Sequence, residues 1–457
     1  MTFVDRKPEM AFLEEHFGRR GAGLLVIWGR RRVGKTALLQ NFSAGKPVMY
    51  HMAVRTTPSD ELRRVSDRLA DFFDDDLIRA QPVGTWEALF AYLAGRTGRF
   101  GLVLDEFPYL VEASPELPTL LQESWDTRLS KTKIKLILCG SSISMMERAL
   151  FAPSAPLFGR RTGQWKVQPF GPLELGLLTG GSLVERIETY SVIGGVPMYA
   201  RLFDQRADLA TNILKRILTK GEVLYEEVPF LLRQELREPR VYQAILAAVA
   251  SGAHRFSELS SKTGLNRANL VRYLAQLEEL ELVRREIPVT EDKPHKSRKG
   301  LYRIAEPFVR FWYRYVYPNL DRLELQDATG VLKERVLPDL HDFIAAGVEP
   351  VLADLFRSGP LKKLVPFRVT QAGRHWSRTE EFDMVMFDQA RERVMIGEVK
   401  WSRKPVHPRL LAELRRRVEA SKVFAKKRIT LALISRSGFR PVPIKKPSER
   451  YVDLSAE

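Results

Sequence analysis

Residues 29–36 read GRRRVGKT, which is the G-x-x-x-x-G-K-T pattern of a phosphate-binding loop. Glycines let the backbone of such a loop curl so that its N–H groups point at phosphate oxygens. Lys35 is expected to reach the β- and γ-phosphates, and the Thr36 hydroxyl to ligate Mg²⁺. The pattern therefore predicts nucleotide binding by nine consecutive residues: Gly29, Arg30, Arg31, Arg32, Val33, Gly34, Lys35, Thr36 and Ala37.

Two carboxylates follow a second apolar run, FGLVLDE at residues 100–106. In a P-loop protein such a strand places one carboxylate beside Mg²⁺ and the next beside the attacking water. Asp105 is the predicted metal residue and Glu106 the predicted water-polarising residue. The alternative is an ordinary strand that ends in acidic residues.

Further polar groups follow a third apolar run at residues 134–140. Ser141 and Ser142 come next, and they either sense the γ-phosphate at the carboxyl edge of the sheet or cap a helix. The segment Gly-Arg-Arg-Thr at 159–162 holds Arg160 and Arg161, which are candidates to neutralise charge on a transferred phosphate. Surface arginines are the alternative interpretation.

Near the end of the chain, residues 382–387 and 394–400 alternate like the two strands of a hairpin. Because side chains repeat every two residues, Glu398 and Lys400 share one face, and Asp383 on the paired strand is expected to join them. Two carboxylates and a lysine can hold Mg²⁺ through Asp383 and Glu398 and orient a water for phosphodiester attack. An exposed Glu–Lys ion pair across the strands is the alternative.

The middle of the chain changes to amphipathic helices at residues 241–250, 256–260 and 266–277, with Gly264 between the last two. This is a helix-turn-helix pattern, with predicted wing strands at 282–285 and 301–303 around a basic tip at 293–299. A packing or switch module is the alternative to DNA binding, and the aromatic segment 307–317 is expected to be a core helix. The predicted phosphate contacts are Arg267, Arg272, Lys296, Arg298 and Lys299.

The elements that must position the first site fit an α/β fold. Residues 21–28 are a nearly unbroken apolar run, typical of a parallel strand buried on both faces, and residues 37–42 open a helix whose N-terminus favours the same anion. The single cysteine, Cys139, excludes an internal disulfide framework. No signal peptide or apolar run of membrane-spanning length is recognisable, so we expect a cytoplasmic protein that binds no membrane.

As a set, these residues resemble the archaeal-type ATPase family of the AAA/STAND-like P-loop proteins. The resemblance rests on the P-loop, residues 3–6 (FVDR), 104–108 (LDEFP), 140–142, 159–161 and 193–197 (IGGVP). It implies that ATP and Mg²⁺ are the cofactors, that Asp5 and Arg6 lie near the adenine, and that Arg160 or Arg161 acts as a sensor or finger. A finger acting in trans would need a homo-oligomer.

The spacing Asp-x(14)-Glu-x-Lys at 383–400 resembles the core of PD-(D/E)xK nucleases. With Glu349 upstream, it also resembles the C-terminal domain of uncharacterised function that accompanies these ATPases. The proline expected before the first aspartate is replaced by Phe382. The resemblance therefore implies a restriction-endonuclease-like α/β fold without settling whether it cleaves.

The length of 457 residues allows two to four domains, and the motifs predict a P-loop ATPase core over 1–170, a helical lid and linker over 171–235, a winged helix over 236–320 and a nuclease-like domain over 321–457. The net charge of +17 is concentrated late, because residues 391–450 hold 18 Lys and Arg against 5 Asp and Glu. We expect a Mg²⁺-dependent ATPase coupled to DNA. The alternative is a nucleotide-operated signalling switch that binds protein partners without cleaving DNA.

Overall fold

The structure is a computed structural model that describes residues 3–141, 143–443 and 446–456. The chain forms two compact units. The first runs up to Pro169 and includes Val196–Met198, and the second comprises Phe170–Gly195 and the chain from Tyr199 onward. No helix within the described residues is long and apolar enough to cross a membrane.

The first unit is built on a five-stranded, all-parallel sheet in the order β2-β3-β4-β1-β5. Three of its strands match the predicted apolar runs closely. The α/β class with a parallel sheet is therefore confirmed for this unit. The strands are β1 (Gly23–Trp28), β2 (Val48–Met52), β3 (Gly101–Asp105), β4 (Lys135–Gly140) and β5 (Gly163–Lys166).

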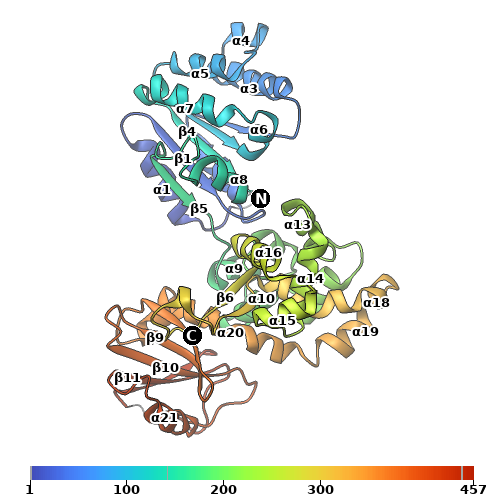
Figure 1. Ribbon diagram of the computed structural model, residues 1–457, viewed down its shortest axis with the longest axis vertical. Coiled ribbons are helices and arrows are strands. Elements are labelled where there is room, and N and C mark those ends of the chain that lie inside the picture. The colour runs from blue at the N-terminus through green and yellow to red at the C-terminus, as the bar shows by residue number, and fades with distance from the viewer. Residues whose placement is uncertain (1–2, 142, 444–445, 457) are drawn as a thin grey trace. The chain divides into compact units, whose positions relative to one another are not determined.

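Helices cover both faces of this sheet (Figure 1), which explains why its central strands are apolar throughout. Leu25 and Ile27 of β1 face the core with α1 (Lys7–Gly18) and α2 (Lys35–Ser43). Leu24 and Val26 face the opposite core, because successive side chains of a strand alternate. The helices of that second core are α3 (Pro58–Phe73), α5 (Trp86–Ala94), α6 (Phe107–Ala113), α7 (Leu117–Thr127) and α8 (Ile143–Met146). Helix α8 continues as a wider helical turn over Glu147–Phe151, and the short helix α4 (Asp76–Ala80) follows α3.

The second unit begins with a group of helices around Tyr199 and Tyr225, which are both buried. Short connections and buried apolar faces join them to the aromatic segment described below. The helices are α9 (Pro172–Thr179), α10 (Leu183–Ile193), α11 (Pro197–Leu202), α12 (Leu209–Asn212) continuing to Leu218, and α13 (Glu227–Glu235).

A helix-turn-helix follows in the predicted place. Gly264 ends the second helix in the left-handed region at φ +70°, and the Asn266 side chain caps the third by accepting from the Asn269 N–H at 2.9 Å. The two predicted wing strands pair antiparallel. The elements are α14 (Pro239–Ala250), α15 (Phe256–Thr263), α16 (Arg267–Glu279), β6 (Val283–Glu286) and β7 (Leu301–Ile304).

The aromatic segment is a buried helix, α17 (Pro307–Phe311), continued to Val316, as predicted. Trp312 is buried, and its indole N–H donates to the carbonyl of Tyr225 at 2.9 Å. This burial leaves Trp312 no face for stacking on a nucleic-acid base. Two short helices, α18 (Leu320–Glu324) and α19 (Ala328–Val331) continued to Val336, come next.

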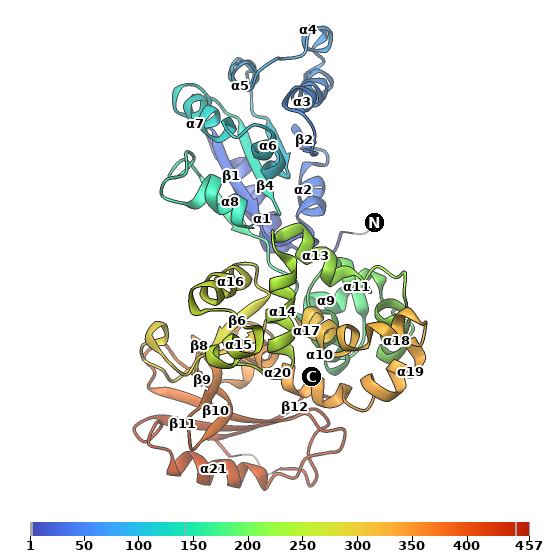
Figure 2. The same ribbon diagram turned by 45° about the vertical axis from the view of Figure 1, so that its right-hand side comes forward.

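The C-terminal part of the second unit is a mixed five-stranded sheet in the order β12-β11-β10-β9-β8. The predicted hairpin is present as antiparallel β9 and β10, whereas β10, β11 and β12 are parallel. Helix α20 packs against β8 and β9, and α21 packs against β11 (Figure 2). The elements are α20 (Leu340–Arg357), β8 (Gln371–Trp376), β9 (Glu381–Phe387), β10 (Arg393–Lys400), α21 (Leu410–Ala420), β11 (Arg428–Ser435) and β12 (Glu449–Asp453).

Candidate functional site

The phosphate-binding loop connects the end of β1 to the start of α2. Gly29 has φ +147°, and a Cβ atom there would overlap the carbonyl oxygen of Val167. Gly34 has φ +95°, a conformation that L side chains rarely adopt. Both glycines of the motif are therefore required by the local backbone.

Lys35 lies inside this loop and is only 5% exposed. Its Nζ donates to the carbonyls of Gly29 and Arg30, each at 2.8 Å. Burial lowers the pKa of Lys35, while the neighbouring Glu106 and Asp105 oppose this shift. A buried ammonium bound by neutral carbonyls is well suited to meet a phosphate anion.

Asp105 ends β3 opposite the loop and is fully buried. Its Oδ2 accepts hydrogen bonds from the Thr36 hydroxyl at 2.8 Å and from the Tyr50 hydroxyl at 2.6 Å. Burial and the Asp105 charge raise the pKa of Tyr50, so Tyr50 stays a neutral donor. The predicted metal pair, Thr36 and Asp105, is thus brought together, and its oxygen donors fit Mg²⁺.

Tyr50 was missed by the sequence analysis because it lies in a short strand, β2, that has no motif. In the parallel pair of β2 and β3, Met52 is aligned with Asp105, which places Tyr50 one pleat away on the same face. The signal that could have identified Tyr50 is its hydroxyl, which lies near the end of the strand that follows the P-loop helix.

Glu106 adopts the left-handed region at φ 54° directly after β3. Its Oε2 accepts from the Ser141 hydroxyl at 2.8 Å and from the Ser141 N–H at 3.3 Å. The structure therefore joins the predicted water-polarising carboxylate to one of the two predicted sensor serines. The other, Ser142, lies outside the described residues.

Arg6 and the remaining residues of the loop make contacts within the first unit. Arg6 donates to the carbonyl of Val33 at 2.6 Å and to the carbonyl of Gln168 at 2.8 Å, which ties the N-terminal segment to the loop. Arg31 donates to the Tyr109 hydroxyl at 2.8 Å. Three further loop residues differ in position: Arg30 is largely buried, Arg32 has φ 66°, and Ala37 is exposed on α2.

The two candidate arginines have different surroundings. Arg160 forms an ion pair with Asp126 at 2.7 Å, which lowers the pKa of Asp126 and raises that of Arg160. Arg161 lies over the Phe151 ring at 4.6 Å, and Phe151 in turn contacts Trp28. Arg161 thus belongs to a packed cluster beside the strand that leads into the loop, whereas Arg160 points to α7.

The five predicted phosphate-contacting residues of the winged helix are all exposed. Among the described residues, Lys299 alone of this set has an ion-pair partner, since its Nζ lies 2.5 Å from Glu291. The set is Arg267, Arg272, Lys296, Arg298 and Lys299.

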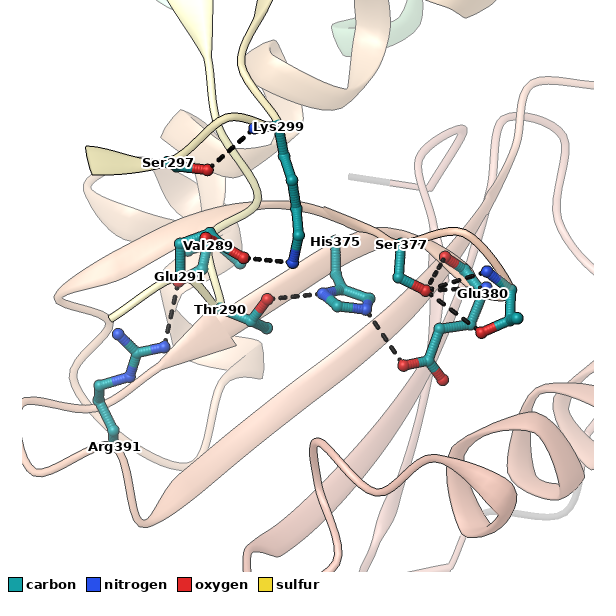
Figure 3. Close-up of polar contacts among 10 residues, drawn as sticks. Val289, Thr290, Glu291, Ser297, Lys299, His375, Ser377, Glu380 and Arg391 are labelled. Carbon is teal, nitrogen blue, oxygen red and sulfur yellow. Dashed lines mark hydrogen bonds and ion pairs between the residues drawn. The ribbon is translucent and has the colours of Figure 1, made fainter. Parts of the chain in front are cut away.

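The loop that follows β6 is attached to the edge strand β8 of the C-terminal sheet (Figure 3). Val289 donates its N–H to the carbonyl of Arg374 at 2.9 Å and accepts from Arg391 at 3.1 Å. Thr290 meets His375 at 2.6 Å through its hydroxyl. The base of the wing is therefore held by the C-terminal sheet, while the basic tip remains exposed.

The predicted carboxylate and lysine constellation is brought together at the end of the β9–β10 hairpin. Glu398 accepts from Lys400 Nζ at 2.7 Å and from Arg417 of α21 at 3.0 Å. Asp383 accepts from the Val399 N–H at 3.0 Å. Burial and the nearby Glu398 charge raise the pKa of Asp383.

Glu349 of α20 joins this cluster from the other side, with Arg374 at 2.7 Å. Burial raises the pKa of Glu349 to about 7, with a further contribution from the Asp383 charge. Across the described ranges, no group of three or more His, Cys, Asp or Glu side chains is arranged to hold a metal ion. Cations already occupy both Glu398 oxygens, which is the physical reason why this cluster is not arranged as a metal cage.

Comparison with known proteins finds matches in successive parts of the chain. Residues 3–202 match a family described as an ATPase domain predominantly from Archaea. An uncharacterised protein of Methanocaldococcus jannaschii, MJECL04, is 32% identical over 405 residues, which is 87% of each chain. The chain belongs to the archaeal-type ATPase family.

The later parts of this archaeal-type ATPase match two other families. Residues 244–285 match the arsR family of bacterial regulatory proteins, which agrees with the helix-turn-helix. Residues 312–417 match a family of archaeal and bacterial proteins of unknown function.

Shorter or more distant similarities were also found. An uncharacterised ATP-binding protein of M. jannaschii, MJ0423, is 46% identical over 48 residues, 10% of this chain and 81% of that one. The Walker-type ATPase PABY2304 of Pyrococcus abyssi has a TM-score of 0.49 at 22% identity, over 68% of this chain and 96% of its own. The ORC2 protein of Aeropyrum pernix has a TM-score of 0.42 at 15% identity, over 72% and 94%.

Proposed function

We propose that this chain hydrolyses ATP with Mg²⁺ and that the nucleotide cycle controls a DNA-binding winged helix and the C-terminal domain. The observation that supports the ATPase proposal best is the arrangement of Lys35, Thr36, Asp105 and Glu106 around one loop. A buried cation, an oxygen pair that fits a metal and a positioned carboxylate are the groups that phosphoryl transfer to water requires.

Each of these residues has a distinct role in the proposal. The Thr36 and Asp105 oxygens would hold Mg²⁺, which when bound neutralises charge on the β- and γ-phosphates. Lys35 exchanges its two loop carbonyls for phosphate oxygens. Glu106 accepts a hydrogen bond from the attacking water and orients it, while Ser141 holds the carboxylate in place. Tyr50 donates to Asp105 and keeps that carboxylate fixed.

Hydrolysis of ATP by the purified full chain tests this proposal. The chain should release phosphate in a Mg²⁺-dependent manner, and Lys35→Ala should abolish the release. The exposed Lys133→Ala is the matched control, because it removes the same charge from the segment just before β4, outside the site. Unchanged hydrolysis in Lys35→Ala would refute the site assignment.

DNA is the proposed partner because five exposed basic residues lie on the helix-turn-helix and wing, and because the C-terminal part holds most of the net charge. Binding to duplex DNA should weaken by orders of magnitude between low and physiological salt, since phosphate contacts release counterions. The quintuple replacement of these residues by Gln should flatten that dependence. Absence of DNA binding at low salt would instead favour the signalling switch that binds protein partners.

A second candidate function is Mg²⁺-dependent phosphodiester cleavage by the nuclease-like cluster. It is supported by the convergence of Asp383, Glu398 and Lys400, and by the raised pKa of Asp383 beside Glu398, which a bound cation would lower. Plasmid nicking with Mg²⁺ or Mn²⁺ tests it. The nicking should disappear in Asp383→Ala and Lys400→Ala, and nicking that persists in both variants would indicate a contaminant.

Roles of Arg160 and Arg161 in the transition state, and the homo-oligomer that a trans-acting arginine needs, are further parts of the proposal. Arg160 must leave Asp126 to reach a phosphate, whereas Arg161 already lies near the strand before the loop. Replacing each by Ala and mixing the variant with a Glu106→Gln chain tests the idea. Restored hydrolysis in the mixture is expected for an arginine that acts in trans.

A further inference from the structure

The wing of the winged helix and the C-terminal sheet are joined directly within the second unit. Val289, at the base of the wing, donates its N–H to the Arg374 carbonyl of β8 at 2.9 Å. The Val289 carbonyl accepts from the Arg391 guanidinium at 3.1 Å, so the turn between β9 and β10 reaches the same residue. Arg391 approaches this segment from one side and Lys299 from the other (Figure 3). The basic tip of the wing therefore has the sheet as its neighbour.

More cations lie beside Arg391, where β10 and β11 begin. The Lys427 ammonium donates to the Arg391 carbonyl at 2.7 Å. Both side chains lie over the buried Phe387 ring, with Arg391 at 4.6 Å and Lys427 at 5.6 Å from its centre. The backbone N–H of Arg428 donates to the Glu392 carbonyl at 2.9 Å. The start of β11 is therefore fixed beside the turn that holds the wing.

The surface that these contacts assemble, here called the wing–sheet surface, is positive even when its own carboxylates are counted. It consists of three segments: residues 291–299, 388–393 and 419–428. Together they hold ten Lys and Arg against five Asp and Glu. Two of the carboxylates are in ion pairs, Glu291 with Lys299 at 2.5 Å and Asp388 with Arg393 at 3.0 Å. Within the described ranges, six exposed cations of these segments have no ion-pair partner: Lys293, Lys296, Arg298, Lys422, Lys426 and Arg428.

A nucleic-acid duplex is the partner that fits the wing–sheet surface. The surface is continuous with the helix-turn-helix, because α16 packs against β6. Its cations can meet the phosphates of a duplex, which carries one negative charge for about every 1.7 Å of its axis. Val423 is the one large apolar side chain that these described segments expose, which is too little apolar area for a protein or membrane interface.

The wing–sheet surface is separate from the carboxylate and lysine cluster. Arg393 begins β10 and Lys400 ends it, and at the rise of a β-strand these residues are about 23 Å apart. A duplex on the wing–sheet surface therefore binds at the other end of the sheet from Lys400. Arg403 and Lys404, which follow Lys400 and are also exposed, provide a matched control for charge.

We propose that the C-terminal sheet extends the DNA-binding surface of the winged helix, so that one duplex is bound by the wing tip and by the start of β11. This inference rests on the DNA partner proposed above. Lys293, Lys296 and Arg298 bind phosphates from the wing, and Lys426 and Arg428 bind phosphates from the sheet. Because hydrogen bonds already join the wing to the sheet, the two sets are preorganised for the same duplex.

Salt-dependent binding of a DNA duplex to the full chain tests this surface. The double variant Lys426→Gln with Arg428→Gln should lower the slope of log K against log salt by about 2, because two phosphate contacts are lost. It should also weaken binding by about tenfold or more at about 0.1 M salt. The double variant Arg403→Gln with Lys404→Gln removes the same two residue types beyond the other end of β10, and it should leave the slope unchanged.

The outcomes distinguish this inference from the function on which it rests. An equal loss in both double variants would show a general effect of net charge. An unchanged slope in Lys426→Gln with Arg428→Gln would show that the sheet does not contact the duplex. Either result overturns the inference, while a slope flattened by the quintuple replacement would still support DNA binding by the winged helix. If the unchanged chain binds no duplex at low salt, both proposals fail.

Photo-cross-linking provides a readout that does not depend on affinity. Cys139 is the only cysteine of the chain and is buried, so a cysteine at the exposed Gln389 of the β9–β10 turn accepts a photoactivatable label selectively. The labelled Gln389→Cys chain should cross-link to the bound duplex. The matched Ala412→Cys chain, labelled on the exposed side of α21, should not. A bound duplex that cross-links to neither, or to both equally, would overturn the inference.

Discussion

The P-loop site and the C-terminal cluster use the same side-chain types, a lysine and two carboxylates, in opposite ways. In the P-loop, the Lys35 ammonium binds backbone carbonyls, and Asp105 and Glu106 accept hydrogen bonds from hydroxyl groups. In the C-terminal cluster, Lys400 binds Glu398 directly, and Arg417 adds a second cation.

This difference decides which charges are free to bind a ligand. Hydroxyl donors leave the negative charge of Asp105 uncompensated, so a metal ion is favoured there, and Lys35 keeps its positive charge for a phosphate. The ion pairs at Glu398 compensate its charge internally, so a metal ion must displace Lys400 or Arg417 before it binds both oxygens. The first site is prepared for its ligands, whereas the second must be rearranged.

The largest expected effect comes from replacing the lysine of each site by alanine and comparing ATP hydrolysis by the two variants. Lys35→Ala should reduce ATP hydrolysis on the order of 100-fold or more, the effect of removing a charged group that stabilises a phosphoryl transition state. Lys400→Ala in the same phosphate-release assay should hydrolyse ATP like the unchanged chain. A comparable loss in both variants would show that the two sites are not separate.

The next test separates binding from turnover at the first site. Glu106→Gln should lower the rate of ATP hydrolysis about 100-fold, since the amide no longer accepts and orients the water as the carboxylate does. Nucleotide affinity, measured with a fluorescent ATP analogue, should change little because Lys35 and Thr36 remain. If affinity falls as much as the rate, Glu106 acts in binding and the role given to it is wrong.

A third test uses the pH dependence of the second site. The folded pKa of Glu349 is about 7, above the value near 4.3 of an unfolded chain, so the folded state holds the proton more tightly. This contribution to stability is complete below pH 4.3 and is lost as pH rises through 7. Relative to Glu349→Gln, the unchanged chain should lose about 2 kcal/mol between pH 5 and pH 8.

Thermal unfolding of both proteins across this pH range measures the difference. Parallel pH profiles for the two proteins would show that Glu349 ionises normally and that the cluster is more solvated than its burial indicates.

The smallest expected effect comes from removing one of the two cations that bind Glu398. Arg417→Gln should tighten Mn²⁺ binding at the C-terminal cluster by about threefold, because a partly exposed ion pair contributes on the order of 1 kcal/mol or less. The neighbouring exposed Arg416→Gln is the matched control. Electron paramagnetic resonance of free Mn²⁺ measures the binding, and equal affinities would show that Arg417 does not compete with a metal.

Much of the fold was predictable because its signals are local. Strong apolar runs marked β1, β3 and β4, and the capping residues Gly264 and Asn266 marked the helix-turn-helix. The β9–β10 hairpin followed from strict alternation. By contrast, β2 and β8 were not predicted, because short half-polar strands carry little periodic signal, and their pairing is set by neighbouring strands.

The candidate sites divide in the same manner. Motif spacing was sufficient to predict four residues of the first site, because the loop and the strand end fix their positions locally. These residues are Lys35, Thr36, Asp105 and Glu106. By contrast, the contacts of Tyr50 with Asp105, of Arg417 with Glu398 and of Glu349 with Arg374 join residues that are 55, 19 and 25 positions apart in the chain.

The sequence by itself determined that this protein has a phosphate-binding loop, a helix-turn-helix and a hairpin bearing Asp383, Glu398 and Lys400. Each of these features depends on residues close together in the chain, where glycine conformation, capping and alternation act. Only the tertiary structure decided which groups face each carboxylate: hydroxyl donors at Asp105 and cations at Glu398. Electrostatic energy depends on distance and burial in space, and sequence spacing alone does not supply either quantity.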